Sequence, residues 1–410
     1  MVMAQDYQHN RTLFHADNLA VLRGMGSETV DLIATDPPFK KGRDFHATPD
    51  SLAAGAKFQD RWSWERDVHD DWVKRIEGSR PFLMEAIESA RYAHSDSMGA
   101  YMCFMAVRLL EMRRVLKETG SIYVHCDPTA SHYLKAVMDA IFKPQRFRNE
   151  IVWSYGLGGS SKRYYSWKHD IILFYTASDE YMFDKPQVPA TSNRMKGKTK
   201  GATSVWAIPS LNNMAKERTG APTQKPLELY ERIVAASSRP GDVILDPFAG
   251  CATTLVAAER LQRQWVGIDI WDGAHEHVLT RMRESVGIFG GITYTTEIPE
   301  LPEGDQPAGP DQQVIERYTE PGPRMTRVQM IRELIDRHGQ KCRGCEREFD
   351  DVRYLQLDHN TPRADGGIDH ITNRVLLCGP CNRLKSNIYT LSGLRKENRR
   401  LGYMAKGRRI

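Results

Sequence analysis

The fold of this chain is decided by the stretch Val30-Asp31-Leu32-Ile33-Ala34-Thr35-Asp36-Pro37-Pro38-Phe39. Its apolar first part indicates a buried strand of an α/β sheet. In such sheets the chemistry lies just beyond the carboxyl ends of the strands, which is where the acid, the two prolines and the aromatic ring follow. Proline fixes its backbone φ angle, so the sequence predicts a rigid turn at that edge.

These four residues suit one reaction, methyl transfer to the exocyclic amine of a nucleic-acid base. The amine lone pair is delocalised into the ring, and two acceptors on its N–H bonds, the Asp36 carboxylate and a proline-fixed carbonyl, would localise it. Flipping the base out of a duplex costs a few kcal/mol. Stacking on Phe39 would return about 1–3 kcal/mol. The alternative is a proline-rich turn without chemistry.

A second motif favours the chemical interpretation. Residues 243–254, Val-Ile-Leu-Asp-Pro-Phe-Ala-Gly-Cys-Ala-Thr-Thr, indicate a strand, a glycine turn and a helix start. A further strand, 264–270, follows and carries Asp269 near its end. A carboxylate about 20 residues beyond a glycine turn is well placed to bind ribose hydroxyls of a nucleoside cofactor.

With these motifs the chain resembles the β-class amino methyltransferases that use S-adenosylmethionine, from about Thr12 to about Arg283. The resemblance implies an α/β, Rossmann-like methyltransferase with circularly permuted motif order, a mostly parallel sheet and helices on both faces. It assigns the catalytic role to Asp36, Pro37, Pro38 and Phe39. It assigns cofactor binding to Asp17, Asp246, Phe248, Ala249, Gly250, Asp269, Thr223 and Lys225. Ala252 departs from the family, in which glycine is usual at this position.

Four cysteines near the C-terminus form two CxxC pairs: Cys342, Cys345, Cys378 and Cys381. The spacing within each pair is that of a zinc knuckle, and one tetrahedral Zn²⁺ held by all four thiolates fits it. Disulfides are the alternative, and the absence of a secretory signal disfavours them. The sequence therefore predicts a structural zinc site.

The segment between the two pairs resembles the HNH, or ββα-metal, endonucleases, over about residues 337–387. Carried over by position, His359 is the general base that activates water and Asn373 orients its ring. Asp358 and Asn382 bind one divalent cation, Mg²⁺ in preference, because both offer oxygen ligands. The zinc would cross-link a domain that is too small to be stabilised by its hydrophobic core alone. The alternative is a zinc-dependent DNA-binding module without catalysis.

Composition and charge indicate the domain layout. We expect a methyltransferase domain over 1–290, with a helical insertion at about 40–101 and a target-recognition segment at about 177–220. A proline- and acid-rich linker over 291–323 and an HNH domain with a basic tail over 324–410 would follow. The last domain has 19 Lys and Arg against 10 Asp and Glu, a net charge of +9, whereas the whole chain carries +5. Such an excess fits phosphate binding.

The function indicated is a bifunctional enzyme of restriction–modification that methylates double-stranded DNA and cleaves it. The Asp start of the tetrapeptide favours adenine N6 over cytosine N4. Two further alternatives are a nuclease whose methyltransferase fold only senses cofactor or methylation, and an RNA-modifying enzyme. One HNH site cuts one strand, which makes a homodimer an option.

With no membrane span or signal peptide visible, the expected compartment is the cytoplasm of a bacterial or phage-infected cell. Three histidines, His125, His132 and His169, lie in ordinary strand or helix patterns, and we expect structural roles for them.

Overall fold

The structure is a computed structural model. It describes residues 9–39, 45–46, 57–58, 60–156, 160–190, 193–212, 215, 217–221, 223–287, 291–308, 325–360, 370–386, 389 and 391–405. Much of the predicted linker, 309–323, and the end of the basic tail, 406–410, lie outside these residues.

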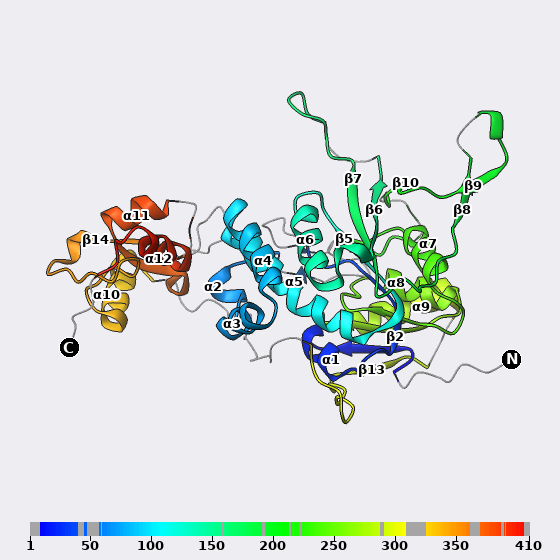
Figure 1. Ribbon diagram of the computed structural model, residues 1–410, viewed down its shortest axis with the longest axis horizontal. Helices are drawn as coiled ribbons and strands as arrows, with labels where there is room; N and C mark the ends of the chain where they lie inside the picture. Colours follow the sequence, from blue (N-terminus) through cyan, green and yellow to red (C-terminus); the bar gives the residue numbers. More distant parts are fainter. Residues whose placement is uncertain are drawn as a thin grey trace. The chain divides into compact units, whose positions relative to one another are not determined.

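Two compact units are formed by the chain (Figure 1). Unit 1 comprises 1–39, 44–59 and 106–312, and unit 2 comprises 40–43, 60–105 and 313–410. The predicted domain limits at 290 and 323 stay predictions.

The core of unit 1 is a nine-stranded sheet in the order β10-β6-β7-β5-β2-β11-β12-β1-β13. Neighbouring strands pair in parallel except at β7, which is antiparallel to both β5 and β6. The strands are β1 (Thr12–His15), β2 (Val30–Thr35), β5 (Leu116–Cys126), β6 (Phe147–Ser154), β7 (His169–Thr176), β10 (Val205–Ala207), β11 (Val243–Asp246), β12 (Gln264–Asp269) and β13 (Thr293–Thr295). The predicted mixed, mostly parallel sheet is confirmed.

Both faces of this sheet are buried, which explains the nearly continuous apolar character of its strands. Leu32 and Ala34 of β2 belong to a core cluster with residues of the helices α7 (Leu227–Ser237), α8 (Thr253–Arg260) and α9 (Ala274–Val286). Ile33, which points to the opposite face, is equally buried. On that side lie α1 (Asn18–Gly24), α5 (Asp96–Val115) and α6 (Ser131–Phe142) (Figure 1).

Strands β2 and β11 are neighbours at the centre of the sheet, where Leu32 pairs with Ile244 and Ile33 with Leu245. In the chain, however, β2 and Asp36 come long before β11 and the glycine turn. Their parallel pairing brings the two motifs to the same edge of the sheet. This is the permuted order that the sequence predicts.

The described part of the predicted insertion is helical. Its helices are α2 (Trp64–Asp67), α3 (Asp70–Ser79), α4 (Pro81–Ala93) and the start of α5. The same stretch of sequence also contains two short strands, β3 (Phe45–His46) and β4 (Lys57–Phe58), which pair antiparallel. The predicted target-recognition segment contains the hairpin of β8 (Gln187–Pro189) and β9 (Thr199–Gly201), and also β10.

The HNH segment of unit 2 is a two-stranded hairpin with helices. Strand β14 (Leu355–His359) pairs antiparallel with β15 (Arg374–Cys378). The helices are α10 (Arg327–His338), α11 (Gly379–Lys385) and α12 (Leu391–Arg400). A capping box between Thr326 and Gln329 starts α10, since Thr326 accepts from the Gln329 amide and the Gln329 side chain accepts in return. The predicted hairpin-plus-helix module is confirmed.

Candidate active sites and zinc centre

The Asp36 carboxylate lies directly beyond the carboxyl end of β2, where the sequence predicts it. Its Oδ2 forms an ion pair with Lys225 Nζ, and the same Nζ lies 4.8 Å from the centre of the Phe39 ring. Lys225 also donates to the carbonyl of Thr223 at 3.3 Å. The structure thus joins two predicted groups of residues, since Lys225, predicted to bind cofactor, contacts the predicted catalytic carboxylate.

The buried imidazole of His125 lies beside Asp36. His125 is 1% exposed, and its Nδ1 lies 3.6 Å from Asp36 Oδ1. Within the described residues neither of these two atoms has a hydrogen-bond partner. The other ring nitrogen, Nε2, lies 3.3 Å from Asp170 Oδ2. An imidazole between two carboxylates can present an N–H to either of them, so this arrangement can orient Asp36.

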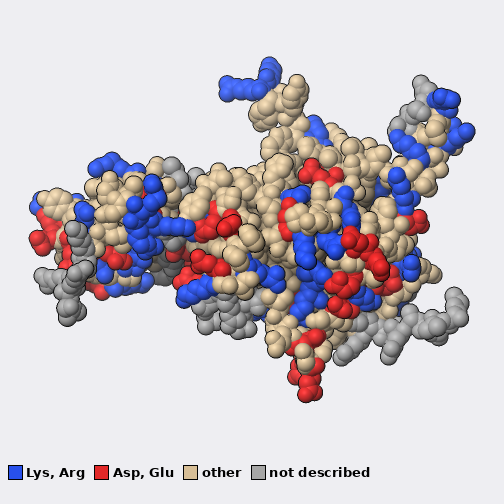
Figure 2. All heavy atoms as spheres, in the orientation of Figure 1, with Lys and Arg blue, Asp and Glu red and all other residues tan. Residues whose placement is uncertain are grey.

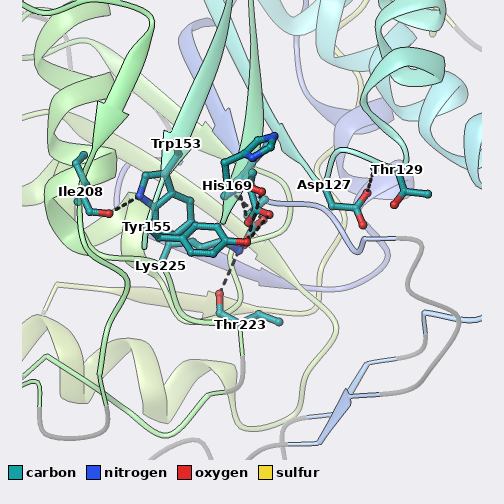
Figure 3. A network of polar contacts seen from close by, with 11 residues as sticks. Asp127, Thr129, Trp153, Tyr155, His169, Ile208, Thr223 and Lys225 are labelled. Atoms are coloured by element: carbon teal, nitrogen blue, oxygen red, sulfur yellow. Dashed lines mark hydrogen bonds and ion pairs between the residues drawn. The ribbon is translucent and has the colours of Figure 1, made fainter. Parts of the chain in front are cut away.

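Aromatic residues close this part of the site (Figure 3). Tyr155 lies with its hydroxyl 3.5 Å from Asp170 Oδ1, and burial, followed by the Asp170 charge, raises its pKa to about 12. Trp153 packs edge-on to His125 with ring centres 5.5 Å apart and donates its indole N–H to the Ile208 carbonyl at 2.8 Å. The Phe39 ring lies 5.3 Å from that of His125.

The predicted cofactor turn follows β11 at the same edge. Gly250 has a φ of +45°, and its amide donates to Asp269 Oδ2 at 2.7 Å. Asp269 Oδ1 accepts from the Trp271 amide at 2.8 Å. A carboxylate oxygen has two lone pairs, so Asp269 can brace the turn and still accept from ribose hydroxyls. Burial raises its pKa.

Asp246 is more deeply buried and braces the start of the turn. Its Oδ1 accepts from the Thr35 hydroxyl at 2.9 Å and from the Phe248 amide at 3.1 Å. Burial raises its pKa to about 7. Ala252, which departs from the family pattern, has a left-handed φ of +59° just before α8, the region that favours glycine.

Asp17, predicted to contact the cofactor, has a structural role as well. It caps α1 by accepting from the Leu19 amide at 2.9 Å, and its Oδ2 pairs with Arg108 Nη2 at 2.9 Å. Arg108 also donates to Asn18 Oδ1 at 2.6 Å, and Asn18 donates to the Pro247 carbonyl at 2.7 Å. This network ties the start of α1 and helix α5 to the cofactor turn.

The four predicted zinc ligands come together in unit 2. Their sulfur atoms lie within 4.8 Å of one another, and all four residues are buried: Cys342, Cys345, Cys378 and Cys381. The sulfurs of Cys345 and Cys378 are 3.9 Å apart, close to the ~3.8 Å edge of a tetrahedron with Zn–S bonds of ~2.3 Å.

Hydrogen bonds around the cluster favour thiolates, which zinc requires. The Cys378 amide donates to Cys342 Sγ at 3.2 Å, and Asn398 Nδ2 lies 3.4 Å from Cys381 Sγ. Bonds among the sulfurs lower the pKa of Cys342 and raise the pKa of Cys378 and of Cys381, so Cys342 is the first of these three thiols to ionise. The residues present therefore fit Zn²⁺.

The predicted nuclease residues lie on and beside the HNH hairpin. Asp358 Oδ2 is 3.2 Å from the ammonium of Lys385, which is almost completely buried. Asn382 Nδ2 donates to Gln356 Oε1 at 2.7 Å, so Asn382 of α11 and Asp358 of β14 both face the contact between helix and hairpin.

The general base predicted for the nuclease lies at the end of β14. His359 Nδ1 lies 3.3 Å from Arg374 Nη1. Asn373, predicted to orient the histidine ring, accepts through its carbonyl from the Asn360 amide at 2.8 Å, directly after His359.

Comparisons with known proteins identify the family. Residues 30–280, more than half of the chain, match the DNA methylase family. The chain belongs to this family. Residues 342–387 match the HNH endonuclease family, so this DNA methylase carries a C-terminal HNH domain.

Curated relatives include the type II methyltransferase M.HpaI of Haemophilus parainfluenzae, 29% identical over 64% of this chain and 70% of the relative. The DNA adenine methyltransferase YhdJ of Escherichia coli is 27% identical over 63% and 78%. Among solved structures, an M1.HpyAVI–SAM complex has 18% identity and a TM-score of 0.39, over 66% of this chain and 98% of that one. The cytosine-N4-specific PvuII DNA methyltransferase has 14% identity and a TM-score of 0.42, over 68% and 90%.

Several residues of this DNA methylase site were missed by the sequence analysis. His125 was expected to be structural, yet it lies beside Asp36, and Asp170, Tyr155 and Arg108 were not singled out at all. Polar residues at strand ends 125 and 170 were the available signal, but only the antiparallel pairing of β5 with β7 shows that they meet. No helix among the residues that the structure describes combines the length and the apolarity needed to span a membrane.

Proposed function

We propose that the protein transfers a methyl group from S-adenosylmethionine to the exocyclic amine of a base flipped out of double-stranded DNA. The observation that carries this proposal is the Asp36 carboxylate at the edge of the sheet, paired with a cation that lies over the Phe39 ring. A carboxylate beside a ring face is what a stacked base with an amino group needs.

The residues of the cofactor turn fit S-adenosylmethionine. Gly250 takes the left-handed φ of the turn and holds Asp269 in place through its amide, and Asp269 would bind the ribose hydroxyls. Asp246, Phe248 and Ala249 would complete the turn. S-adenosylmethionine supplies a methyl group bonded to a positively charged sulfur, which makes that carbon an electrophile.

Chain residues would activate the acceptor. Asp36 accepts one N–H bond of the amine and the backbone carbonyl of Pro37 or Pro38 accepts the other, so that the lone pair is localised on nitrogen. As the nitrogen–carbon bond forms, the carbon–sulfur bond breaks and its electrons stay on sulfur. The nitrogen then loses one proton, for which Asp36 is the nearest base and His125 the next.

Adenine N6 is the proposed acceptor. The Asp start of the tetrapeptide supports it, and so does the named activity of the relative YhdJ, a DNA adenine methyltransferase. A role in restriction–modification is supported by the type II methyltransferases among the relatives and by the HNH domain on the same chain.

The HNH domain would cleave DNA, with His359 as general base, Asn373 as its positioning residue, and Mg²⁺ at Asp358 and Asn382. One observation favours the second candidate, a DNA-binding module without cleavage. The Lys385 ammonium lies 3.2 Å from Asp358 Oδ2, and a cation at that oxygen opposes the binding of a second one. Lys385 and Mg²⁺ can share the carboxylate if the metal binds Oδ1, the other oxygen of Asp358.

Two variants of the full-length protein separate these functions. In Asp36→Ala we expect methyl transfer from labelled S-adenosylmethionine to fall at least about a hundredfold, with Mg²⁺-dependent cleavage retained. In His359→Ala we expect Mg²⁺-dependent cleavage to be lost and methyl transfer to be retained. Modified-base sequencing of DNA from cells expressing His359→Ala would report the base and its context.

Transfer unaffected by Asp36→Ala would overturn the methyltransferase assignment. Full cleavage by His359→Ala, or none by the wild type at any Mg²⁺ concentration, would leave the DNA-binding module as the function of the HNH domain. Preferred transfer to matched RNA oligonucleotides would exclude DNA as the substrate.

A further inference from the structure

An arm of exposed aromatic residues joins β6 to β7. We call residues 160–168 the aromatic arm. The exposed fractions are 68% for Tyr164, 97% for Tyr165 and 55% for Trp167. Three large rings this exposed within four positions mark an interaction site more often than ordinary surface.

The arm starts at the catalytic edge of the sheet. Strand β6 is antiparallel to β7, which is antiparallel to β5, so β6 runs parallel to β5 and β2. Its carboxyl end therefore lies at the same edge as Asp36. Tyr155, at the root of the arm, bonds through its amide to the Lys168 carbonyl at 3.1 Å and through its hydroxyl to Asp170, the residue behind His125.

Charge on the arm fits a polyanion. Lys162 and Arg163 are exposed next to the three rings. A second projection, the β8–β9 hairpin, presents the exposed residues Arg194, Lys196 and Lys198. In Figure 1 both projections extend from the sheet in the same direction, and Figure 2 shows Lys and Arg side chains at both tips.

We propose that the aromatic arm is the duplex-opening element of this enzyme, and that Tyr165, supported by Trp167, enters the base stack in place of the flipped target base. This rests on the proposed function, since only an enzyme that flips a base leaves such a gap. An inserted ring restores stacking on both neighbouring base pairs. Lys162 and Arg163 would hold the flanking phosphates while the target base stacks on Phe39.

The rings need a partner with flat, apolar faces among negative charges, and the opened duplex has both. A second copy of the chain or a protein partner would have to supply an acidic, apolar groove instead. These occupants are distinguished by the experiment, because only the duplex-opening role depends on whether the target base is paired.

The test compares two substrates in single-turnover methyl transfer, with His359→Ala as the background so that DNA stays intact. One substrate is a duplex with the methylation site fully paired, and the other has an abasic site opposite the target base. We expect Tyr165→Ala and Trp167→Ala to lower the rate on the paired duplex by about tenfold to a hundredfold. On the unpaired target the loss should be less than about threefold, because that base leaves the stack easily. Phe82→Ala on α4, where the ring is 77% exposed, is the matched control and should be neutral on both.

A second readout follows base flipping without methyl transfer. With 2-aminopurine at the target position, fluorescence should rise with the parent protein and rise less with Tyr165→Ala. Equal losses on both substrates, or no loss on either, would overturn the proposal. A changed oligomeric state in Tyr165→Ala with equal losses would assign the arm to an interface between copies. Absence of transfer by the parent protein on both substrates would instead be a failure of the proposed function.

Discussion

Lys225 and Asp36 form an ion pair in the position that the proposed reaction needs for its substrate. The ammonium bonds to Asp36 Oδ2 and lies over the Phe39 ring, where the amine and ring of a flipped base would lie. The Thr223 carbonyl, 3.3 Å from the same nitrogen, offers the ammonium a second partner. A carboxylate oxygen has two lone pairs, so Lys225 can shift towards Thr223 and still hold Asp36 in position.

Replacing Lys225 by methionine should therefore lower kcat for methyl transfer by about tenfold to a hundredfold, the usual range for a lost bond to a charged group. Lys117→Met is the matched control, because Lys117 pairs with Asp31 at 2.8 Å near the other end of β2. The measurement is steady-state transfer with varied DNA. A Lys225→Met enzyme that is faster than the wild type would mean that the lysine only competes with the base.

The imidazole behind Asp36 should act as a positioning residue. In His125→Leu, the Asp36 carboxylate loses the ring that fixes it and Asp170 loses its partner, so we expect kcat to fall about tenfold or more while KM for DNA changes little. His125→Asn keeps a polar group at the site and should recover part of the loss. A larger KM with an unchanged kcat would show that His125 acts on DNA binding instead.

The sequence predicts the structure best where a residue type and its neighbours in the chain determine the local geometry. The strand ending in Asp36, the glycine turn at Gly250 and the pairs of cysteines were all recognisable, because local spacing fixes their geometry. The structure brings the predicted residues of each motif together at one edge or one cluster.

The sequence does not predict a contact that depends on pairing between distant strands or on the reach of a long side chain. Lys225 was predicted beside the cofactor, but its side chain reaches Asp36, and no local pattern reports such a reach. His125 and Asp170 come together only because β7 is antiparallel to β5. The ion pair of Asp358 with Lys385 likewise links a strand to a helix far along the chain.

Asp246 should make the stability of unit 1 depend on pH. Burial raises the pKa of this carboxyl to about 7, above its value of about 3.9 in the unfolded chain. The folded state then holds an extra proton between about pH 4 and pH 7, so the free energy of unfolding falls as pH rises through that window and levels off above it. In Asp246→Asn this contribution, on the order of 2 kcal/mol between pH 5 and pH 8, should disappear.

This change in the free energy of unfolding is measured by urea unfolding at pH 5 and at pH 8, followed by the tryptophan fluorescence of unit 1. Asp272→Asn, at a carboxyl whose side chain is 98% exposed, is the control and should keep the pH dependence of the wild type. An Asp246→Asn variant with the same pH dependence as the wild type would show that the Asp246 carboxyl is ionised in the folded protein at neutral pH.

Zinc binding should depend on a residue outside the four cysteines. Asn398 is fully buried and donates to Cys381 Sγ at 3.4 Å, which stabilises the thiolate and fixes its direction. We expect metal analysis to find one zinc per chain, and competition with a chromophoric chelator to show about tenfold to a hundredfold weaker binding in Asn398→Ala. Arg399→Ala, at an exposed position on the same helix, is the control and should bind zinc as tightly as the wild type. Removal of the zinc by a chelator should also unfold the HNH segment, because the four cysteines are part of its small core. Unchanged zinc affinity in Asn398→Ala would show that the four thiolates alone set the strength of the site.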